Sequence, residues 1–180
     1  MRHFSSRKIS ASAVVSRKSF WQRLFGKITW EEALNAASTP RDICRLVGRH
    51  LSYVSDDGEL WESPRRTWER GKGDCEDYAI TILEMCRTKN IPAFLRLYFP
   101  ASRPIGHAIV IGKKPDGGLW MSSVASYREI QSQQEATERV AAELGCRPSE
   151  MWIVDLSYED VMDRIRSHAA TEFGEVAARK

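Results

Sequence analysis

The sequence lacks any uninterrupted apolar segment near the roughly 20 residues that a membrane-spanning helix needs. The longest early apolar stretch, residues 11–15, contains a serine and is too short for the core of a signal peptide. The cysteines also form no CxxC pair and no cysteine–histidine cluster with zinc-ligand spacing, so we expect no structural zinc site. These absences predict a cytoplasmic protein without a transmembrane segment, whose thiols are free. The four cysteines are Cys44, Cys75, Cys86 and Cys146.

Acidic residues are absent from the first 30 positions, which hold seven lysine and arginine residues. The other 150 residues carry 20 basic and 24 acidic side chains, so the net charge of +3 belongs to the N-terminal segment. We therefore divide the chain into a basic arm over residues 1–28, which ends in an amphipathic helix over residues 17–28, and one domain over residues 29–175. The pattern of that helix favours packing on a core. Contact with an anionic membrane surface or with nucleic acid is the alternative.

Local patterns predict both helices and strands along the chain. The capping residues Thr29, Thr39, Asp74 and Ser157 each precede apolar residues at helical spacing. Alternation of apolar and polar residues indicates strands, and Lys113–Asp116 joins two of them as a hairpin. The predicted helices cover residues 29–37, 39–51, 75–89, 133–144 and the segment after 157, and the predicted strands cover residues 94–99, 105–112, 119–124 and 151–155.

Residues 55–73 show neither helical spacing nor strand alternation of apolar residues, and they are predicted to form a long loop directly before the strongest helical signal. The loop carries Trp61 and Trp68 and ends at Gly73, where the missing side chain allows a sharp turn. Loops held by a rigid scaffold often carry binding residues. We therefore expect Trp61, Trp68 and Gly73 to line a substrate cleft.

Cys75 stands at the predicted N-terminus of the following helix, directly after its cap Asp74. A free thiol has a pKa near 8.5, so only a few per cent is thiolate at neutral pH. The positive end of the helix dipole favours the anion, whereas Asp74 and Glu76 oppose it if they point toward the sulfur. The backbone N–H of Cys75 is a candidate donor to a developing oxyanion. The pattern indicates a nucleophilic cysteine, and a capped helix with a buried cysteine is the alternative.

His107 lies in a predicted strand, 32 residues after the cysteine, and is the candidate general base. If Lys113–Asp116 is a four-residue loop, Gly112 lies opposite Gly117, and the ladder then places Ser122 opposite His107 on the same face. Ser122 would orient the ring through its far nitrogen. A serine can orient an imidazole, but it cannot stabilise an imidazolium as a carboxylate does.

The segment Trp68–Ala79, WERGKGDCEDYA, resembles the nucleophile segment of the bacterial transglutaminase-like cysteine proteinases. The resemblance covers about residues 40–125 and implies a papain/transglutaminase-like α+β fold, in which helices flank a small antiparallel sheet, with Cys75 as nucleophile and His107 as general base. LapG-like members of this family bind calcium through acids beside the cysteine, which implies Asp74 and Glu76 here. The likeness continues through residues 90–92, 95–97 and 106–110.

Two departures from the family pattern stand out. The family's third catalytic residue is an aspartate in a strand pattern of the Trp-x-Leu-Asp-Asn kind. The matching stretch here is Trp120–Ser123, and we place Ser122 in the position of the aspartate. The second departure is the lack of an export signal, which argues against a periplasmic adhesin as substrate.

The leading hypothesis is a cysteine-nucleophile hydrolase or acyltransferase that acts on protein amide bonds, most simply a peptidase with a protein or peptide substrate. It requires no cofactor for the chemistry of the Cys75–His107 pair, calcium aside. The alternative is an attenuated peptide- or protein-binding module of the same fold, which the serine in place of a carboxylate favours. A third hypothesis gives residues 1–28 a separate function as a basic arm for an anionic surface.

Overall fold

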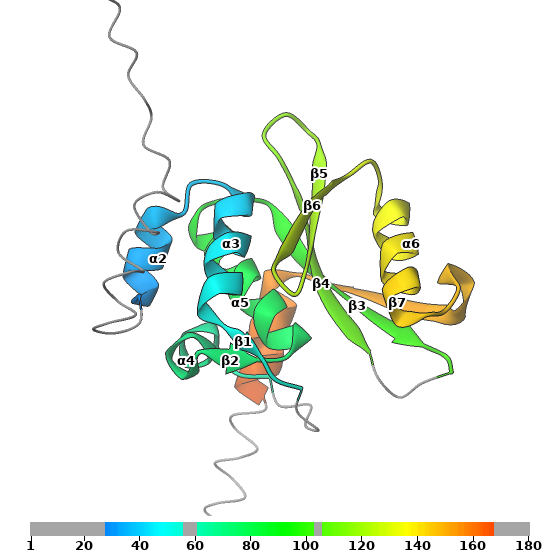
Figure 1. The fold of residues 1–180 in the computed structure, drawn as a ribbon, viewed down its shortest axis with the longest axis horizontal. Helices are drawn as coiled ribbons and strands as arrows, with labels where there is room; N and C mark the ends of the chain where they lie inside the picture. Colours follow the sequence, from blue (N-terminus) through cyan, green and yellow to red (C-terminus); the bar gives the residue numbers. More distant parts are fainter. Residues whose placement is uncertain (1–27, 56–60, 103–105, 168–180) are drawn as a thin grey trace, which may run out of the picture.

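The computed structural model describes residues 28–55, 61–102 and 106–167 of the 180-residue chain (Figure 1). The amphipathic helix predicted over residues 17–28 therefore lies, apart from its last residue, outside the described part. None of the described helices is long and apolar enough to cross a membrane. The helices are α2 (Trp30–Ala36), α3 (Pro40–His50), α4 (Pro64–Arg70), α5 (Cys75–Thr88) and α6 (Gln133–Leu144), with a 3-10 turn η1 (Pro148–Glu150) and a further helical segment over residues 158–167. The strands are β1 (Ser52–Tyr53), β2 (Lys72–Gly73), β3 (Ala93–Pro100), β4 (His107–Lys113), β5 (Leu119–Ser123), β6 (Ser126–Ile130) and β7 (Met151–Leu156).

Local capping interactions begin or end the helices α2, α5 and α6 where the sequence predicts. Thr29 caps α2 by accepting a bond from the backbone of Glu32, whose carboxylate bonds in return to Thr29 N, both at 3.2 Å. At the end of α5, Asn90 adopts the left-handed conformation with φ 55°, which stops the helix before the following proline. Gly145 ends α6 in the same way with φ 66°.

The loop predicted over residues 55–73 is wrong in its second half, where the chain forms α4. Ser63 caps this helix by accepting a hydrogen bond from Arg66 N at 3.4 Å, and Pro64 occupies its first turn. Gly71 ends it with φ 69°. A capping hydroxyl followed by proline is the same signal that opens α3, so the sequence does contain the evidence for α4.

The main sheet has the strand order β6-β5-β4-β3-β7, and every neighbouring pair is antiparallel. The short strands β1 and β2 form a separate parallel pair, in which Tyr53 lies opposite Gly73. Strand β6 at one edge was not predicted. It follows β5 through Val124 and Ala125, which both have positive φ angles, of 43° and 62°, and for which the sequence shows neither glycine nor asparagine.

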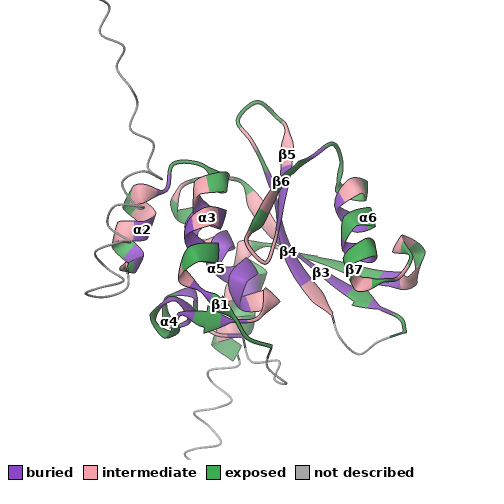
Figure 2. Cartoon of the chain, in the orientation of Figure 1, coloured by how far each residue is buried: buried purple, intermediate pink, exposed green. Residues whose placement is uncertain are grey.

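Two hydrophobic cores lie on opposite faces of this sheet (Figures 1 and 2). On one face, α3 and α5 pack against sheet residues that include Leu97, Val110 and Trp120. On the other face, α6 packs against residues that include Ile109 and Met121. Neighbouring residues of one strand alternate between the two cores, as the pleat requires. The predicted α+β fold, with the nucleophile helix on a small antiparallel sheet, is confirmed.

The hairpin between β4 and β5 has a different register from the predicted one. Gly112 pairs with Trp120 and not with Gly117. Gly117 has φ 85°, a conformation of turns and not of strands, so it lies inside a loop that is longer than expected. The register therefore shifts by three residues. Because an odd shift moves a side chain to the other face of a strand, Ser122 does not face His107.

Candidate active site

Cys75 is the first residue of α5, and Asp74 caps that helix as predicted. Asp74 Oδ1 accepts hydrogen bonds from the backbone N–H groups of Glu76, at 2.9 Å, and Asp77, at 3.1 Å. The backbone N–H of Ala108 lies close enough to the partly buried thiol of Cys75 to lower its pKa. Ala108 directly follows the candidate base in β4. Packing of α5 on β4 thus brings together the two segments that the chemistry needs.

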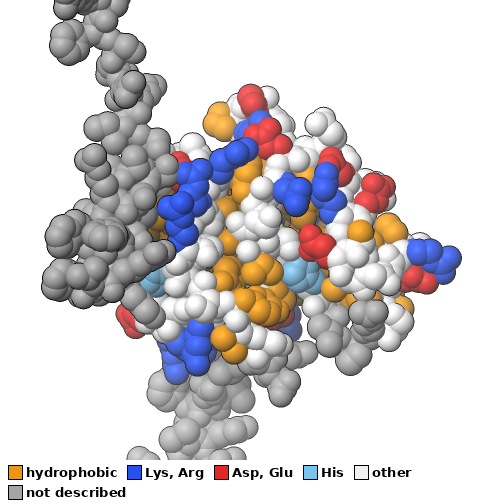
Figure 3. Space-filling view, in the orientation of Figure 1, with side chains coloured by type: hydrophobic (Ala, Val, Ile, Leu, Met, Phe, Trp, Pro, Cys, Tyr) orange, Lys and Arg blue, Asp and Glu red, His pale blue; other side chains and the backbone are white. Residues whose placement is uncertain are grey.

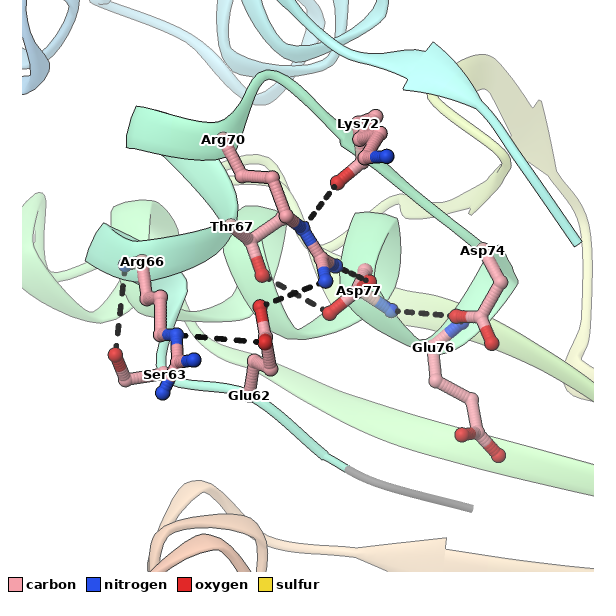
Figure 4. Close-up of polar contacts among 9 residues, drawn as sticks. All are labelled: Glu62, Ser63, Arg66, Thr67, Arg70, Lys72, Asp74, Glu76 and Asp77. Carbon is pink, nitrogen blue, oxygen red and sulfur yellow. Dashed lines mark hydrogen bonds and ion pairs between the residues drawn. The ribbon is translucent and has the colours of Figure 1, made fainter. Parts of the chain in front are cut away.

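A buried carboxylate ties the start of α5 to α4 (Figure 4). Asp77 is 5% exposed, and it accepts a hydrogen bond from Thr67 Oγ1 at 2.9 Å and pairs with Arg70 Nη2 at 2.9 Å. Arg70 also pairs with Glu62 at 3.2 Å and donates to the carbonyl of Lys72 at 3.3 Å. Burial raises the pKa of Asp77 to about 6 in spite of these partners. The network holds the helix that carries the nucleophile.

His107 is the first residue of β4, and its side chain is 13% exposed. Its Nε2 lies 2.9 Å from Ser123 Oγ, at the end of β5. Ser123 Oγ in turn donates to Glu143 Oε2 on α6 at 3.0 Å, and that oxygen lies 3.8 Å from His107 Nε2. With Nε2 so engaged, Nδ1 is the ring nitrogen left to serve as a base. Burial lowers the pKa of His107 more than the Glu143 charge raises it, so the ring is neutral at neutral pH.

The thiol of Cys75 is protonated in the resting protein. Burial raises its pKa to about 11, and the N–H of Ala108 opposes this shift only in part. The charges of Asp74 and Glu76 raise the pKa further, as the sequence analysis foresaw for acids beside the sulfur. Desolvation therefore outweighs the effect of the Ala108 N–H, and the thiol is protonated at neutral pH. The base must take the proton during the reaction.

The sequence matches the model of a known protein family. The model describes the transglutaminase-like superfamily and matches residues 25–122, which is more than half of the chain and includes both Cys75 and His107. The chain belongs to the transglutaminase-like superfamily. Membership agrees with the papain-like fold and supports cysteine-based hydrolase or acyltransferase chemistry in general. No curated protein sequence matches the chain.

The two tryptophans predicted to line the cleft of this transglutaminase-like domain are core residues. Trp61 is 4% exposed and Trp68 is 3% exposed. Trp68 stacks on His50 with 3.8 Å between the ring centroids. A cavity of about 300 Å³ opens beside Trp68, but its lining includes neither Cys75 nor His107. Burial of such large apolar side chains stabilises the fold, and a role of Trp61 and Trp68 in a substrate cleft stays a prediction.

Gly73, the third predicted cleft residue, is buried and is required by packing. A Cβ atom at this position would lie 2.4 Å from both Cβ and Oδ2 of Asp77. Such a separation is far below van der Waals contact, so a side chain here would displace the buried carboxylate. Gly73 thus positions the nucleophile helix, and nothing in its surroundings marks it as a substrate contact.

Ser122 occupies a different environment from the one predicted for a third catalytic residue. It pairs with Val110 and is 2% exposed on the face opposite to His107. Its hydroxyl lies near the thiol of Cys44, whose pKa burial raises to about 11 against a smaller opposite effect of that hydroxyl. Ser122 Oγ makes no well-aligned hydrogen bond to other described residues. The residue is therefore part of the core.

Two residues that were not predicted from the sequence, Ser123 and Glu143, lie at His107. The signal for Ser123 was present, because in the pattern Trp-x-Leu-Asp the aspartate comes three residues after the tryptophan. Three residues after Trp120 is Ser123, not Ser122. No signal pointed to Glu143, which lies outside the matched range and approaches through the packing of α6.

Calcium ligation by Asp74 and Glu76 stays a prediction. Oδ1 of Asp74 is engaged by two N–H groups of the helix. Within residues 28–55, 61–102 and 106–167, no three aspartate, glutamate, histidine or cysteine side chains converge on one point as a metal site would require. Calcium takes six to eight oxygen ligands, more than two carboxylates supply.

Proposed function

We propose that this transglutaminase-like protein is a cysteine-dependent hydrolase of protein amide bonds, a peptidase that uses Cys75 and His107. The observation that supports this most strongly is the arrangement at the start of β4. There the N–H of Ala108 acts on the thiol, and the preceding residue, His107, has its Nε2 engaged by Ser123. This leaves Nδ1 as the base for the thiol proton.

The reaction begins from a neutral thiol and a neutral imidazole. As Sγ of Cys75 attacks the carbonyl carbon, Nδ1 of His107 takes the thiol proton, and the backbone N–H of Cys75 donates to the developing oxyanion. The imidazolium then returns this proton to the amine, and the C–N bond breaks to leave a thioester. Water, deprotonated by the same nitrogen, hydrolyses the thioester and regenerates the thiol. An amine in place of water gives acyl transfer.

The protein surface around α5 suits an extended peptide. Tyr53 and Val54 are 53% and 44% exposed, and Val54 N donates to the carbonyl of Gly73 at 2.9 Å, next to the strand that leads into Cys75. On the face shown in Figure 3, hydrophobic side chains gather in the region of α5, and charged side chains of both signs lie around them. Such a surface fits apolar side chains of a protein substrate.

Acylation by p-nitrophenyl acetate tests the proposal without knowledge of the natural substrate. We expect an acetyl thioester on Cys75, identified by mass spectrometry of the tryptic peptide, and its loss in Cys75→Ser and His107→Ala. Cys146→Ser, which removes the other partly exposed cysteine, is the matched control. Acetylation of Cys146 at the same rate as Cys75 would refute the proposal. New N-termini in denatured casein report peptidase activity, and incorporation of a dansylated amine reports acyl transfer.

A second candidate function is an attenuated peptide-binding module of the same fold. Two observations favour it: Ser123 stands where the superfamily pattern has an aspartate, and burial holds the pKa of the Cys75 thiol at about 11. Ser123→Asp discriminates the two functions. A large rise in the acetylation rate shows an attenuated enzyme that lost its carboxylate. An unchanged low rate in both forms, together with binding of unfolded peptides, favours the binding module.

A further inference from the structure

The geometry points to Glu143 as the carboxylate partner of His107, which it reaches through the hydroxyl of Ser123. Glu143 comes from α6 and supplies the negative charge that the superfamily pattern places on the strand itself. It is a positioning residue, because it acts on the base and not on the substrate. Its catalytic effect rests on the function proposed above, whereas its electrostatic coupling to His107 does not.

The hydrogen bonds have a defined direction. Ser123 Oγ donates its single proton to Glu143 Oε2 at 3.0 Å, because an ionised carboxylate is only an acceptor. The hydroxyl oxygen can then only accept from His107 Nε2, at 2.9 Å. His107 must therefore carry its proton on Nε2 and present the lone pair of Nδ1, the tautomer that a base for Cys75 needs. The chain of bonds selects the catalytic form of the ring.

The serine is required because Glu143 does not reach the ring by itself. Its Oε2 lies 3.8 Å from His107 Nε2, which is too long for a hydrogen bond. At this separation the charge still stabilises an imidazolium through space, since opposite charges within about 4–6 Å favour the charged form. Ser123 orients the ring, and Glu143 holds the hydroxyl and supplies the charge. Together they do what one aspartate does in the superfamily pattern.

Two other titratable residues, Tyr98 and Cys75, come from elements that pack near His107. Tyr98 on β3 is its ladder partner, and its hydroxyl lies 3.4 Å from Thr137 Oγ1 on α6. Cys75 on α5 contacts the residue after His107. Among the described residues, Glu143 is the charged group that acts on the pKa of the imidazole, and it raises that pKa against burial. Removing the charge therefore has a defined sign.

The test is an NMR pH titration of the His107 ring in the full-length resting protein, combined with the rate of Cys75 acetylation by p-nitrophenyl acetate. Glu143→Gln keeps the side-chain shape and removes the charge. Glu138→Gln is its matched control, because Glu138 lies on the same helix and accepts a hydrogen bond from the side-chain amide of Gln134 at 3.1 Å. His107→Ala assigns the signal, and thermal unfolding of each variant confirms the fold.

We expect Glu143→Gln to lower the pKa of His107 by about one unit, which makes the imidazolium about tenfold less stable. Acetylation of Cys75 should slow by about the same factor. Ser123→Ala should also slow acetylation but lower the pKa less, because the charge remains; Ser122→Ala, at the neighbouring core serine, should change neither.

An unchanged His107 pKa in Glu143→Gln would overturn the inference, and so would an equal change in Glu138→Gln. A wild-type protein whose Cys75 is not acetylated would refute the proposed function instead. In that case the NMR titration would still decide whether Glu143 is coupled to His107.

Discussion

Alkylation of Cys75 by iodoacetamide should become steadily faster from about pH 6 to about pH 10, with no plateau near neutrality. The thiolate is the reacting species. With a pKa of about 11, roughly one thiol in ten thousand is ionised at neutral pH, against about 3% for a free thiol of pKa near 8.5. Ionisation alone therefore slows the reaction by about 300-fold relative to a free thiol.

Part of this deficit is recovered, because a thiolate of higher pKa is the stronger nucleophile. With a Brønsted coefficient of about 0.5, a difference of 2.5 units makes the thiolate of Cys75 roughly 20-fold more reactive. The net rate at neutral pH should then be about 15- to 20-fold below that of free cysteine. Partial burial slows the reagent further, so this factor is a lower bound.

The assay follows modification of Cys75 by mass spectrometry in the Cys146→Ser background, with Cys75→Ser as the blank. His107→Ala supplies the decisive comparison. Because His107 is neutral in the resting protein, its removal should leave the pH profile of alkylation where it is. A plateau with its half-point below about pH 8, moved upward by His107→Ala, would mean that a thiolate–imidazolium pair already exists, and our reading of the resting state would be wrong.

Four further predictions concern the surroundings of the site. Gly73→Ala should destabilise the protein by about 1–3 kcal/mol in urea unfolding, because its Cβ would lie 2.4 Å from Asp77; an unchanged midpoint would show that the helix start yields freely. The pKa of Asp77 is raised from 3.8 to about 6, so the folded state binds this proton more tightly than the unfolded state does. As the pH rises between these values, the free energy of unfolding of the wild type should therefore fall relative to that of Asp77→Asn. The same pH dependence in both proteins would contradict this. If calcium binds beside the nucleophile, isothermal titration should give a saturable signal that Glu76→Gln weakens, and equal signals in both proteins would place the ion elsewhere. If the basic arm contacts anionic surfaces, deletion of residues 1–27 should abolish sedimentation with anionic liposomes, and unchanged sedimentation would contradict the hypothesis. The deletion keeps Ile28, whose carbonyl accepts a hydrogen bond from the indole N–H of Trp68 at 3.0 Å.

Short-range signals explain what could be predicted. The cap at Asp74, the helix after it and the end of that helix at Asn90 depend on contacts within a few residues, so the sequence displays them directly. The same holds for the alternation that marks β3, β4 and β5. The nucleophile and the base could be chosen because one begins a helix and the other begins a strand. The first position of a helix or strand determines how exposed its side chain is and where that side chain points.

The register of the β4–β5 hairpin shows where such signals end. A loop with two neighbouring glycines admits several lengths, and local sequence does not decide between them. The actual choice depends on which face each strand buries. With Trp120 in the core against α5, Ser122 follows it inward and Ser123 is left on the face of His107. The position of Glu143 beside His107 could not be predicted, because it depends on how α6 packs across the sheet.

The sheet separates the two chemical halves of the site. Cys75 belongs to the core formed with α5, whereas Glu143 belongs to a helix that packs on the smaller core of the opposite face. Strand β4 runs between them, and its first residue, His107, is followed by Ala108, whose backbone N–H acts on the thiol. Opening of the α6 layer alone would release the carboxylate while the thiol stays in position. Catalytic competence and global folding can therefore be lost at different temperatures, and the difference would measure how firmly α6 is attached.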